Sequence, residues 1–412
     1  MKHIKNFNLF EMAMGVPEGN TELAKRIYQR IADLYEYELN DLIDKKTLNF
    51  SMYDDFRISD YEINKISIEI NLQYSTILEK GEVQLISMAF KDALGITKTN
   101  KEYYTKRFNQ STVNLIINLG ISVDGTEASD LNRFLTNKKN KLTSSIAHEL
   151  KHAYDSYKKP INKLVNRSEY STFTKLCFGI KAIDKFFFNL YYTSVIENLV
   201  KPSELAASIS VGDINKENFL NFLKSDRTYS NLKTMQSYTY EKFRADLLAD
   251  VSKIRSTLEI FDIEVPEKDN DVVDLILKLA YNNLKNEKMK SLYSIIDKLT
   301  SDDDFLGSIL NGSKTQEEKY LDKYLSKISY ENYEDFFVYE IKKFIFVSSN
   351  MLRKLSKLYD MAKDVKVNPL HAKITAKGLD KEVSTDLNVE SIDNIDLWRE
   401  VNGIKPDIKN IK

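Results

Sequence analysis

The sequence predicts an α+β protein, with a small sheet in its first half and helices throughout its second half. Apolar and polar residues alternate with the two-residue period of a strand over Ile66–Leu72 and again over Val113–Val123. Residues 83–90 are a weaker third candidate strand. From residue 216 onward no alternation of that quality occurs, and apolar residues recur at three- and four-residue steps, as in amphipathic helices.

Helices are predicted before and after the strands, in segments whose apolar residues recur at helical spacing. Their ranges are 21–44, 143–158, 180–200, 203–210, 237–261, 270–299, 315–328 and 332–364. Pro160 ends the helix over 143–158, and Pro202 is interpreted as a break between the helices over 180–200 and 203–210. The polar run 138–141 is interpreted as a loop.

The composition indicates long elements with few turns. Gly (12) and Pro (6) are scarce against averages of about 7% and about 5%. The expected organisation has four segments. These are an N-terminal helical segment over 1–49, a core of sheet and helices over 50–215, a helical region over 216–365, and a tail over 366–412 that docks locally or stays mobile.

Charge and apolar stretches exclude several classes of protein. Lys and Arg total 60 and Asp and Glu total 61, so binding of nucleic acid or an anionic membrane by bulk charge is excluded. The most apolar stretch, Phe186–Ile196, has about half the length that a bilayer requires. No uninterrupted apolar segment follows Met1, so classical secretion is not expected. The single cysteine, Cys177, excludes an intrachain disulfide and is expected to be a small buried apolar residue.

Two of the four histidines stand four residues apart, in the pattern His148-Glu149-Leu150-Lys151-His152. On an α-helix such residues are separated by about 40° and about 6 Å, so both imidazoles can bind one metal ion. Glu149 projects about 100° round from His148, from where it can reach a water molecule at that ion as a general base. Zinc suits such ligands and lowers the pKa of its bound water toward about 7. The pattern would arise by chance in on the order of 0.3% of shuffled sequences, so a zinc site is expected.

The motif resembles that of the zincin metallopeptidases, with His148 and His152 as zinc ligands and Glu149 as the catalytic base. The longer run Ala147–Asp155 resembles the active helix of metallopeptidases encoded by bacteriophages, and the Lys-, Asn-, Ile- and Tyr-rich composition is compatible with such a source. The resemblance covers 50–215 and implies a zincin-like catalytic core, in which a twisted sheet lies over two helices and an edge strand binds an extended peptide. For a phage-encoded protein, the expected location is the host cell cytoplasm or the virion.

The third zinc ligand decides the subclass of zincin. Metzincins continue the motif with Gly and then His or Asp, but the corresponding positions here are Asp155 and Lys158, which excludes that branch. A third histidine is not expected, because only His3 and His371 are left. A glutamate on a later helix, as in gluzincins, remains.

Glu204 is the preferred third ligand and Glu197 is the alternative. The sequence Glu-Leu-Ala that begins at Glu204 resembles the third-ligand helix of several gluzincins, and the small Ala206 and Ala207 would let that helix approach the metal closely. Glu169 is a more distant candidate. For any one of these glutamates, the alternative is an ordinary carboxylate on a helix surface.

Two further roles have candidates. Asp155 lies three residues after His152 and could orient an imidazole N–H, although a solvated carboxylate at a helix end is an equal alternative. Peptide hydrolysis also needs a donor for the developing oxyanion, usually Tyr, His or Arg. The candidates, which the sequence does not rank, are Tyr191, Tyr192, Tyr238, Tyr240 and His371.

Together these residues lead to the expectation of a zinc-dependent endopeptidase with one catalytic zinc ion and a peptide or protein substrate. Peptide deformylase shares the motif, but its cysteine ligand lies upstream, whereas Cys177 lies downstream. The alternative is a non-enzymatic structural or interaction protein, such as a phage virion or host-takeover component, whose zincin site is vestigial or structural. The helical region 216–365 favours that alternative, because no minimal peptidase needs it, and it is a candidate surface for a protein partner.

Overall fold

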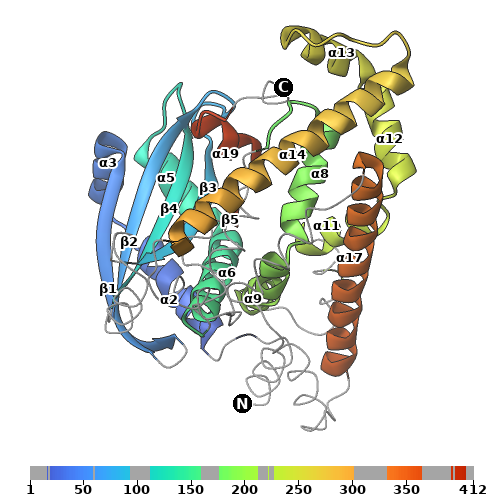
Figure 1. Ribbon diagram of the computed structural model, residues 1–412. Coiled ribbons are helices and arrows are strands. Elements are labelled where there is room, and N and C mark those ends of the chain that lie inside the picture. The colour runs from blue at the N-terminus through green and yellow to red at the C-terminus, as the bar shows by residue number, and fades with distance from the viewer. Residues whose placement is uncertain are drawn as a thin grey trace. The chain divides into compact units, whose positions relative to one another are not determined.

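The fold belongs to the predicted α+β class in the computed structural model of the chain (Figure 1). The structure describes residues 16, 19–58, 61–92, 112–158, 176–211, 221, 227–300, 332–363, 391–392 and 395–404. The predicted helix over 315–328 lies outside them.

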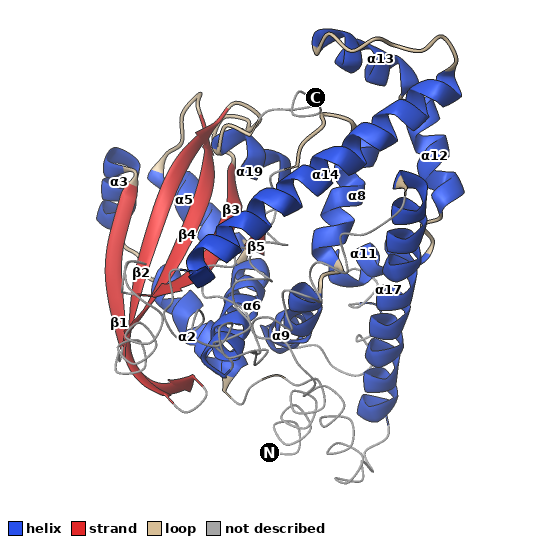
Figure 2. Cartoon of the chain, in the orientation of Figure 1, coloured by secondary structure: helices blue, strands red, loops and turns tan. Residues whose placement is uncertain are grey.

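Four long strands and one short strand form a mixed sheet in the order β1-β2-β4-β3-β5. The strands are β1 (Thr47–Ile58), β2 (Tyr61–Ser75), β3 (Val83–Asp92), β4 (Thr112–Ser122) and β5 (Ser391–Ile392). β2 and β4 are parallel, and the other neighbouring pairs are antiparallel. Figure 2 shows the long strands side by side in one twisted layer. The three predicted strands are therefore confirmed as β2, β4 and β3, whereas β1 and β5 were not predicted.

The described helices account for most of the predicted helical segments. Their bounds are α2 (Asn20–Ala32), α3 (Glu36–Lys45), α5 (Ala128–Asn137), α6 (Lys139–Lys158), α8 (Lys181–Tyr192), α9 (Val195–Val211), α11 (Arg227–Gln236), α12 (Tyr240–Ala249), α13 (Val251–Ile260), α14 (Asp269–Thr300), α17 (Tyr333–Lys363) and α19 (Ile395–Val401). Among them, α5, α11 and α19 were not predicted.

Several predicted helix boundaries were wrong. The segment 180–200 divides into α8 and α9, with Thr193 and Ser194 between them. The segment 21–44 is two helices, since the backbone N–H of Tyr35 donates to Glu38 and begins α3. The polar run 138–141 is no loop, because Lys138 ends α5 and the residues after it form the first turn of α6. The segment 237–261 divides at Asp250, which lies between α12 and α13.

The chain divides into two compact units. Unit 1 comprises Met1–Lys163, Asn198–Asp226 and Leu355–Asn402, and unit 2 comprises Leu164–Glu197, Arg227–Lys354 and Gly403–Lys412. The division into four segments stays a prediction.

The core of unit 1 lies between one face of the sheet and the helices α2, α3, α5 and α6. Every second residue of β4 from Val113 to Ile121 is buried on that face. On the opposite face a row of side-chain hydrogen bonds crosses all four long strands, from Thr47 to Asn71 (2.8 Å), Asn118 (3.3 Å) and Ser87 (2.8 Å). This row stabilises one register, because a slip by one residue would turn each side chain to the other face.

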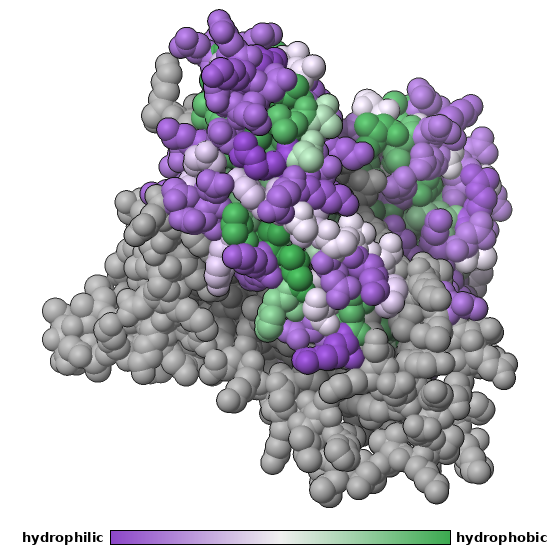
Figure 3. All heavy atoms as spheres, turned by 90° about the vertical axis from the view of Figure 1, so that its right-hand side faces the viewer, coloured by the Kyte–Doolittle hydropathy of each residue, from purple (hydrophilic) through white to green (hydrophobic). Residues whose placement is uncertain are grey.

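Unit 2 has an aromatic core. The ring of Phe186 on α8 lies 5.3 Å from Phe243 on α12 and 5.3 Å from Phe344 on α17, centroid to centroid. Cys177 is half-buried, so the expectation that it is buried was wrong. Hydrophilic residues cover much of the described surface in Figure 3, with smaller apolar patches between them. No helix among the described residues combines the length and apolar character needed to cross a bilayer.

Part of the predicted tail docks on the sheet of unit 1. β5 pairs with β3, and α19 buries Leu397 against Leu78 and Ile86. The carboxylate of Glu400 accepts hydrogen bonds from the backbone N–H of Thr76 (2.8 Å), from the Thr76 hydroxyl (2.5 Å) and from the Ser75 hydroxyl. α19 is therefore held by one apolar anchor and one charged anchor.

The docking of α19 is expected to weaken at acid pH. Burial raises the pKa of Glu400, but the hydrogen bonds from Ser75 and Thr76 lower it by more, so the pKa of this carboxyl lies below its ordinary value of 4.5. The ionised form therefore stabilises the docked helix above that value, and the contribution is lost as the pH falls through the lowered pKa. Hydrogen exchange of the α19 amides, corrected for intrinsic rates, should increase on acidification in the wild-type chain and lose this dependence in Glu400→Gln. An unchanged pH dependence in Glu400→Gln would assign the effect to another group.

Candidate metal centre

The two motif histidines lie close together on α6. Their Nε2 atoms are 3.1 Å apart, and the ring centroids are 4.7 Å apart in an edge-to-face arrangement. His148 is 5% exposed and His152 is 2% exposed, so neither ring is on the surface. The predicted helical juxtaposition of the two imidazoles is therefore present.

α6 is held firmly in unit 1. It has no Gly or Pro, and its apolar side chains Leu142, Ile146 and Leu150 are buried in the core under the sheet. Asn20, at the start of α2, is buried and donates a hydrogen bond from Nδ2 to the carbonyl of Ala147 (3.0 Å), the residue before His148. The helix that carries the histidines thus has a fixed position against both the sheet and α2.

The second helix of the site is α9, which begins earlier than predicted. Pro202 does not break it, and α9 continues through this residue to Val211. At its start, the Ser194 hydroxyl accepts a hydrogen bond from the backbone N–H of Glu197 (3.4 Å), as an N-cap does. The prediction of a break was wrong because a proline removes a single backbone donor, which a buried helix can tolerate. The pattern Ser-x-x-Glu at Ser194–Glu197 is an N-terminal helix signature that could have located this start.

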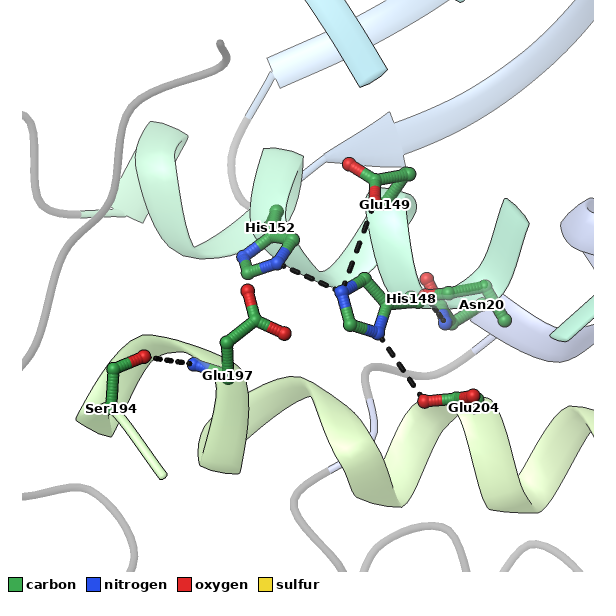
Figure 4. Close-up of polar contacts among 8 residues, drawn as sticks. Asn20, His148, Glu149, His152, Ser194, Glu197 and Glu204 are labelled. Carbon is green, nitrogen blue, oxygen red and sulfur yellow. Dashed lines mark hydrogen bonds and ion pairs between the residues drawn. The ribbon is translucent and has the colours of Figure 1, made fainter. Parts of the chain in front are cut away.

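Two glutamates of α9 face α6 at different heights (Figure 4). One carboxylate oxygen of Glu197, one ring nitrogen of His148 and one ring nitrogen of His152 all lie within 4.8 Å of one another. Seven residues later, about two helical turns, Oε2 of Glu204 lies 3.4 Å from Nδ1 of His148. Glu197 is 2% exposed, whereas the Glu204 side chain is 33% exposed.

The boundary between the two units falls within α9, directly after Glu197. The rest of this helix belongs to unit 1 together with α6, and its Ala207 is part of the core of unit 1. Because one helix carries both glutamates, the position of Glu197 follows from that of α9. Ala206 and Ala207 are fully buried.

This geometry reverses the preference between the two candidate ligands. The preferred Glu204 contacts the outer nitrogen of His148, whereas the alternative Glu197 joins the group formed by both histidines. Sequence could not decide between them, because residues seven apart lie on the same helix face. Only the axial position of α9 relative to α6 decides which of the two glutamates lies near both histidines.

Glu149 lies beside this group. Its Oε1 atom is 3.8 Å from Nε2 of His148, the nitrogen that faces His152, and the residue is 1% exposed. The carboxylate is therefore within reach of a small molecule held next to the two histidines, as its position in the motif predicts.

A buried lysine on the same helix face was not anticipated. Lys201 is 2% exposed and comes four residues after Glu197 and three before Glu204. Side chains at these spacings are neighbours on a helix, so a positive charge accompanies the two carboxylates. The spacing Glu-x-x-x-Lys-x-x-Glu was visible in the sequence but gave no indication that the lysine would be buried.

The group fits a zinc ion. Zinc binds imidazole nitrogen at about 2.0–2.1 Å in tetrahedral geometry, which separates two such nitrogens by about 3.3 Å. The observed 3.1 Å between the Nε2 atoms is close to that value. The Glu197 oxygen lies within 4.8 Å of a ring nitrogen of each histidine, so the three side chains offer two neutral ligands and one anionic ligand. A hydrogen bond between the rings is the alternative, but it would not require a buried carboxylate beside them.

The remaining candidates are not joined to this site. Glu169, His3 and His371 lie outside the described residues, and so does the side chain of Asp155. The four candidate tyrosines belong to the aromatic core of unit 2, where Tyr191 and Tyr238 are buried and Tyr192 and Tyr240 pack against the buried residues. The oxyanion donor therefore stays unassigned.

Comparisons with known proteins add no further information. No family model, no curated protein and no solved structure matches the chain.

Proposed function

We propose that the chain is a zinc-dependent endopeptidase. The observation that carries this proposal is the convergence of His148, His152 and Glu197 in a buried group with Glu149 beside it. Two neutral imidazoles and one carboxylate are a ligand set that catalytic zinc sites use, with a fourth position left for water or substrate. Zinc bound there would supply a water of lowered pKa and would polarise the scissile carbonyl.

Glu149 is the general base of the proposed reaction. It would accept a proton from the attacking water and deliver it to the leaving amine, so that the amine departs neutral. Its carboxylate lies 3.8 Å from Nε2 of His148, so a water molecule on an ion held by that nitrogen would be within its reach. Because the residue is 1% exposed, bulk solvent does not screen the carboxylate.

Glu204 is a positioning residue in this proposal. Its Oε2 atom lies 3.4 Å from Nδ1 of His148, so an N–H on Nδ1 can donate to the carboxylate. That tautomer leaves the lone pair of His148 on Nε2, which faces His152. Glu204 would thus hold the ring in its orientation and increase the basicity of the ligating nitrogen.

The substrate class rests on the resemblance to zincins. The sheet on α6, with α9 bringing a carboxylate to the histidines, is similar to the zincin-like core that the motif implies. Peptide bonds are the substrates of that class. A protein partner for the helices of unit 2 stays a separate expectation.

The direct test is the metal content of the purified full-length chain. We expect about one zinc per chain by elemental analysis, and hydrolysis of an internally quenched peptide library that a chelator abolishes and added zinc restores. A folded chain that takes up no stoichiometric zinc would contradict the proposal. Stoichiometric zinc without hydrolysis would instead favour the structural protein with a non-catalytic site.

A further inference from the structure

One edge of the sheet is occupied by the chain's own C-terminal segment. β4 covers one side of β3, and on the other side β5 is the only neighbouring strand among the described residues. The pairing is antiparallel and short, with Ser87 opposite Ile392 and Met88 opposite Ser391. Two paired positions are few for a strand of ten residues such as β3, so β5 alone gives this contact little stability.

The segment is held mainly by α19, the helix that comes after β5. Leu397 on α19 is fully buried between Leu78 and Ile86, on the face of the sheet opposite α6. Gly120 on β4 leaves room for it, since a Cβ atom there would lie 3.0 Å from Leu397 Cδ2. Glu400 adds the hydrogen bonds to the end of β2. The segment thus wraps around the β3 edge and is anchored on the far face.

The occupied edge lies beside one helix of the candidate metal centre. α6, the helix of His148 and His152, contacts β3 and also contacts β5. All three elements belong to unit 1. An exposed strand edge binds extended polypeptide through its backbone N–H and C=O groups, and here the β3 edge at Ser87 and Met88 is already paired with another strand.

We propose that β5, anchored by α19, is a built-in occupant of the β3 edge, which an extended substrate peptide must displace before it can pair there. This inference rests on the proposed peptidase function for the identity of the competitor. The short pairing of β5 with β3 lets the edge open, and the anchor of α19 keeps the segment nearby. β5 can leave the edge while α19 stays docked, so the segment lowers the affinity for substrate without closing the site permanently.

The test removes the anchor in the full-length chain. In Leu397→Asp the buried carboxylate should release α19, and with it β5. Ser87 and Met88 are neighbours in β3, so the N–H of only one of them faces β5, and exchange of that amide should become at least about tenfold faster while the amide that faces β4 stays protected. KM for the quenched peptide library should fall while kcat stays unchanged. A synthetic peptide of residues 391–402 should reverse both effects. Val123→Asp, at an exposed aliphatic position in the same unit, is the matched control and should change neither.

The outcomes separate the two proposals. Unchanged exchange and unchanged KM in a folded Leu397→Asp chain would overturn the built-in occupant. Faster exchange that the peptide reverses, in a chain that hydrolyses no peptide, would support a displaceable segment and contradict the peptidase. If Leu397→Asp fails to fold, Glu400→Gln carries the test, because it keeps the apolar anchor and weakens only the hydrogen bonds to Ser75 and Thr76.

Discussion

Glu149→Gln is expected to abolish most of the hydrolysis while the chain keeps its zinc. The amide has nearly the same shape as the carboxylate but cannot accept a proton, and positioned general acid–base groups contribute about 10²- to 10⁴-fold to rate. A fall of that size in kcat, with KM and zinc content unchanged, is the expected result. Steady-state kinetics on the quenched peptide library and elemental analysis of the same sample measure it.

The matched control for this variant is Glu36→Gln. Glu36 lies in the exposed first turn of α3, so its substitution makes the same chemical change away from the site. It should leave both kcat and zinc content as in the wild type. Hydrolysis that survives in Glu149→Gln would remove Glu149 from the mechanism, and loss of zinc in this variant would make Glu149 a ligand instead.

Glu197→Gln and Glu204→Gln are expected to differ in their effect on zinc binding. Glu197 belongs to the group of possible ligand atoms, whereas Glu204 contacts His148 on its far side. Loss of a partner that orients a ligand typically costs about 10- to 100-fold in metal affinity, and loss of the ligand itself should cost more. Zinc affinity, measured by competition with a chelator of known strength, should therefore fall further in Glu197→Gln.

Glu197→Gln and Glu204→Gln should also differ in how much zinc raises their Tm. A ligand at 1,000 times its Kd stabilises the folded state by about 4 kcal/mol, so zinc should raise the Tm of the wild type and of Glu204→Gln. In Glu197→Gln the zinc-dependent increase should be nearly lost at the same concentration. The two substitutions are chemically identical and lie on one helix face, so each is a control for the other. The opposite ranking would make Glu204 the third ligand.

The elements that sequence could predict are those whose signal is local. β2 and β4 alternate cleanly because one face of each is buried, and the motif on α6 needs only its own helix. β1 was missed although Leu48, Phe50 and Met52 alternate, because Asp54 and Asp55 interrupt the apolar pattern, at the point where the register shifts.

The third member of the candidate site could not be predicted, because it depends on how two helices pack. Glu197 and Glu204 have the same orientation around α9, and only the axial position of that helix decides which of them meets both histidines. That position follows from buried contacts such as those of Ala207, which lies far in sequence from the sheet it packs under. Only the start of α9 at Ser194 had a local signature.

The strand order also bears on how the chain folds. β2 and β3 are joined by a short connection, yet they form no hairpin, because β4 lies between them and is made last of the four long strands. Until the chain has been synthesised through residue 122, the end of β4, the edges of β2 and β3 that pair with β4 are unpaired. Such edges are prone to intermolecular pairing. Folding of unit 1 therefore depends on a late, non-local step, the insertion of β4, which makes it slow relative to a hairpin-built sheet of the same size. The number of residues between β3 and β4 thus sets the time during which a nascent chain is exposed to aggregation.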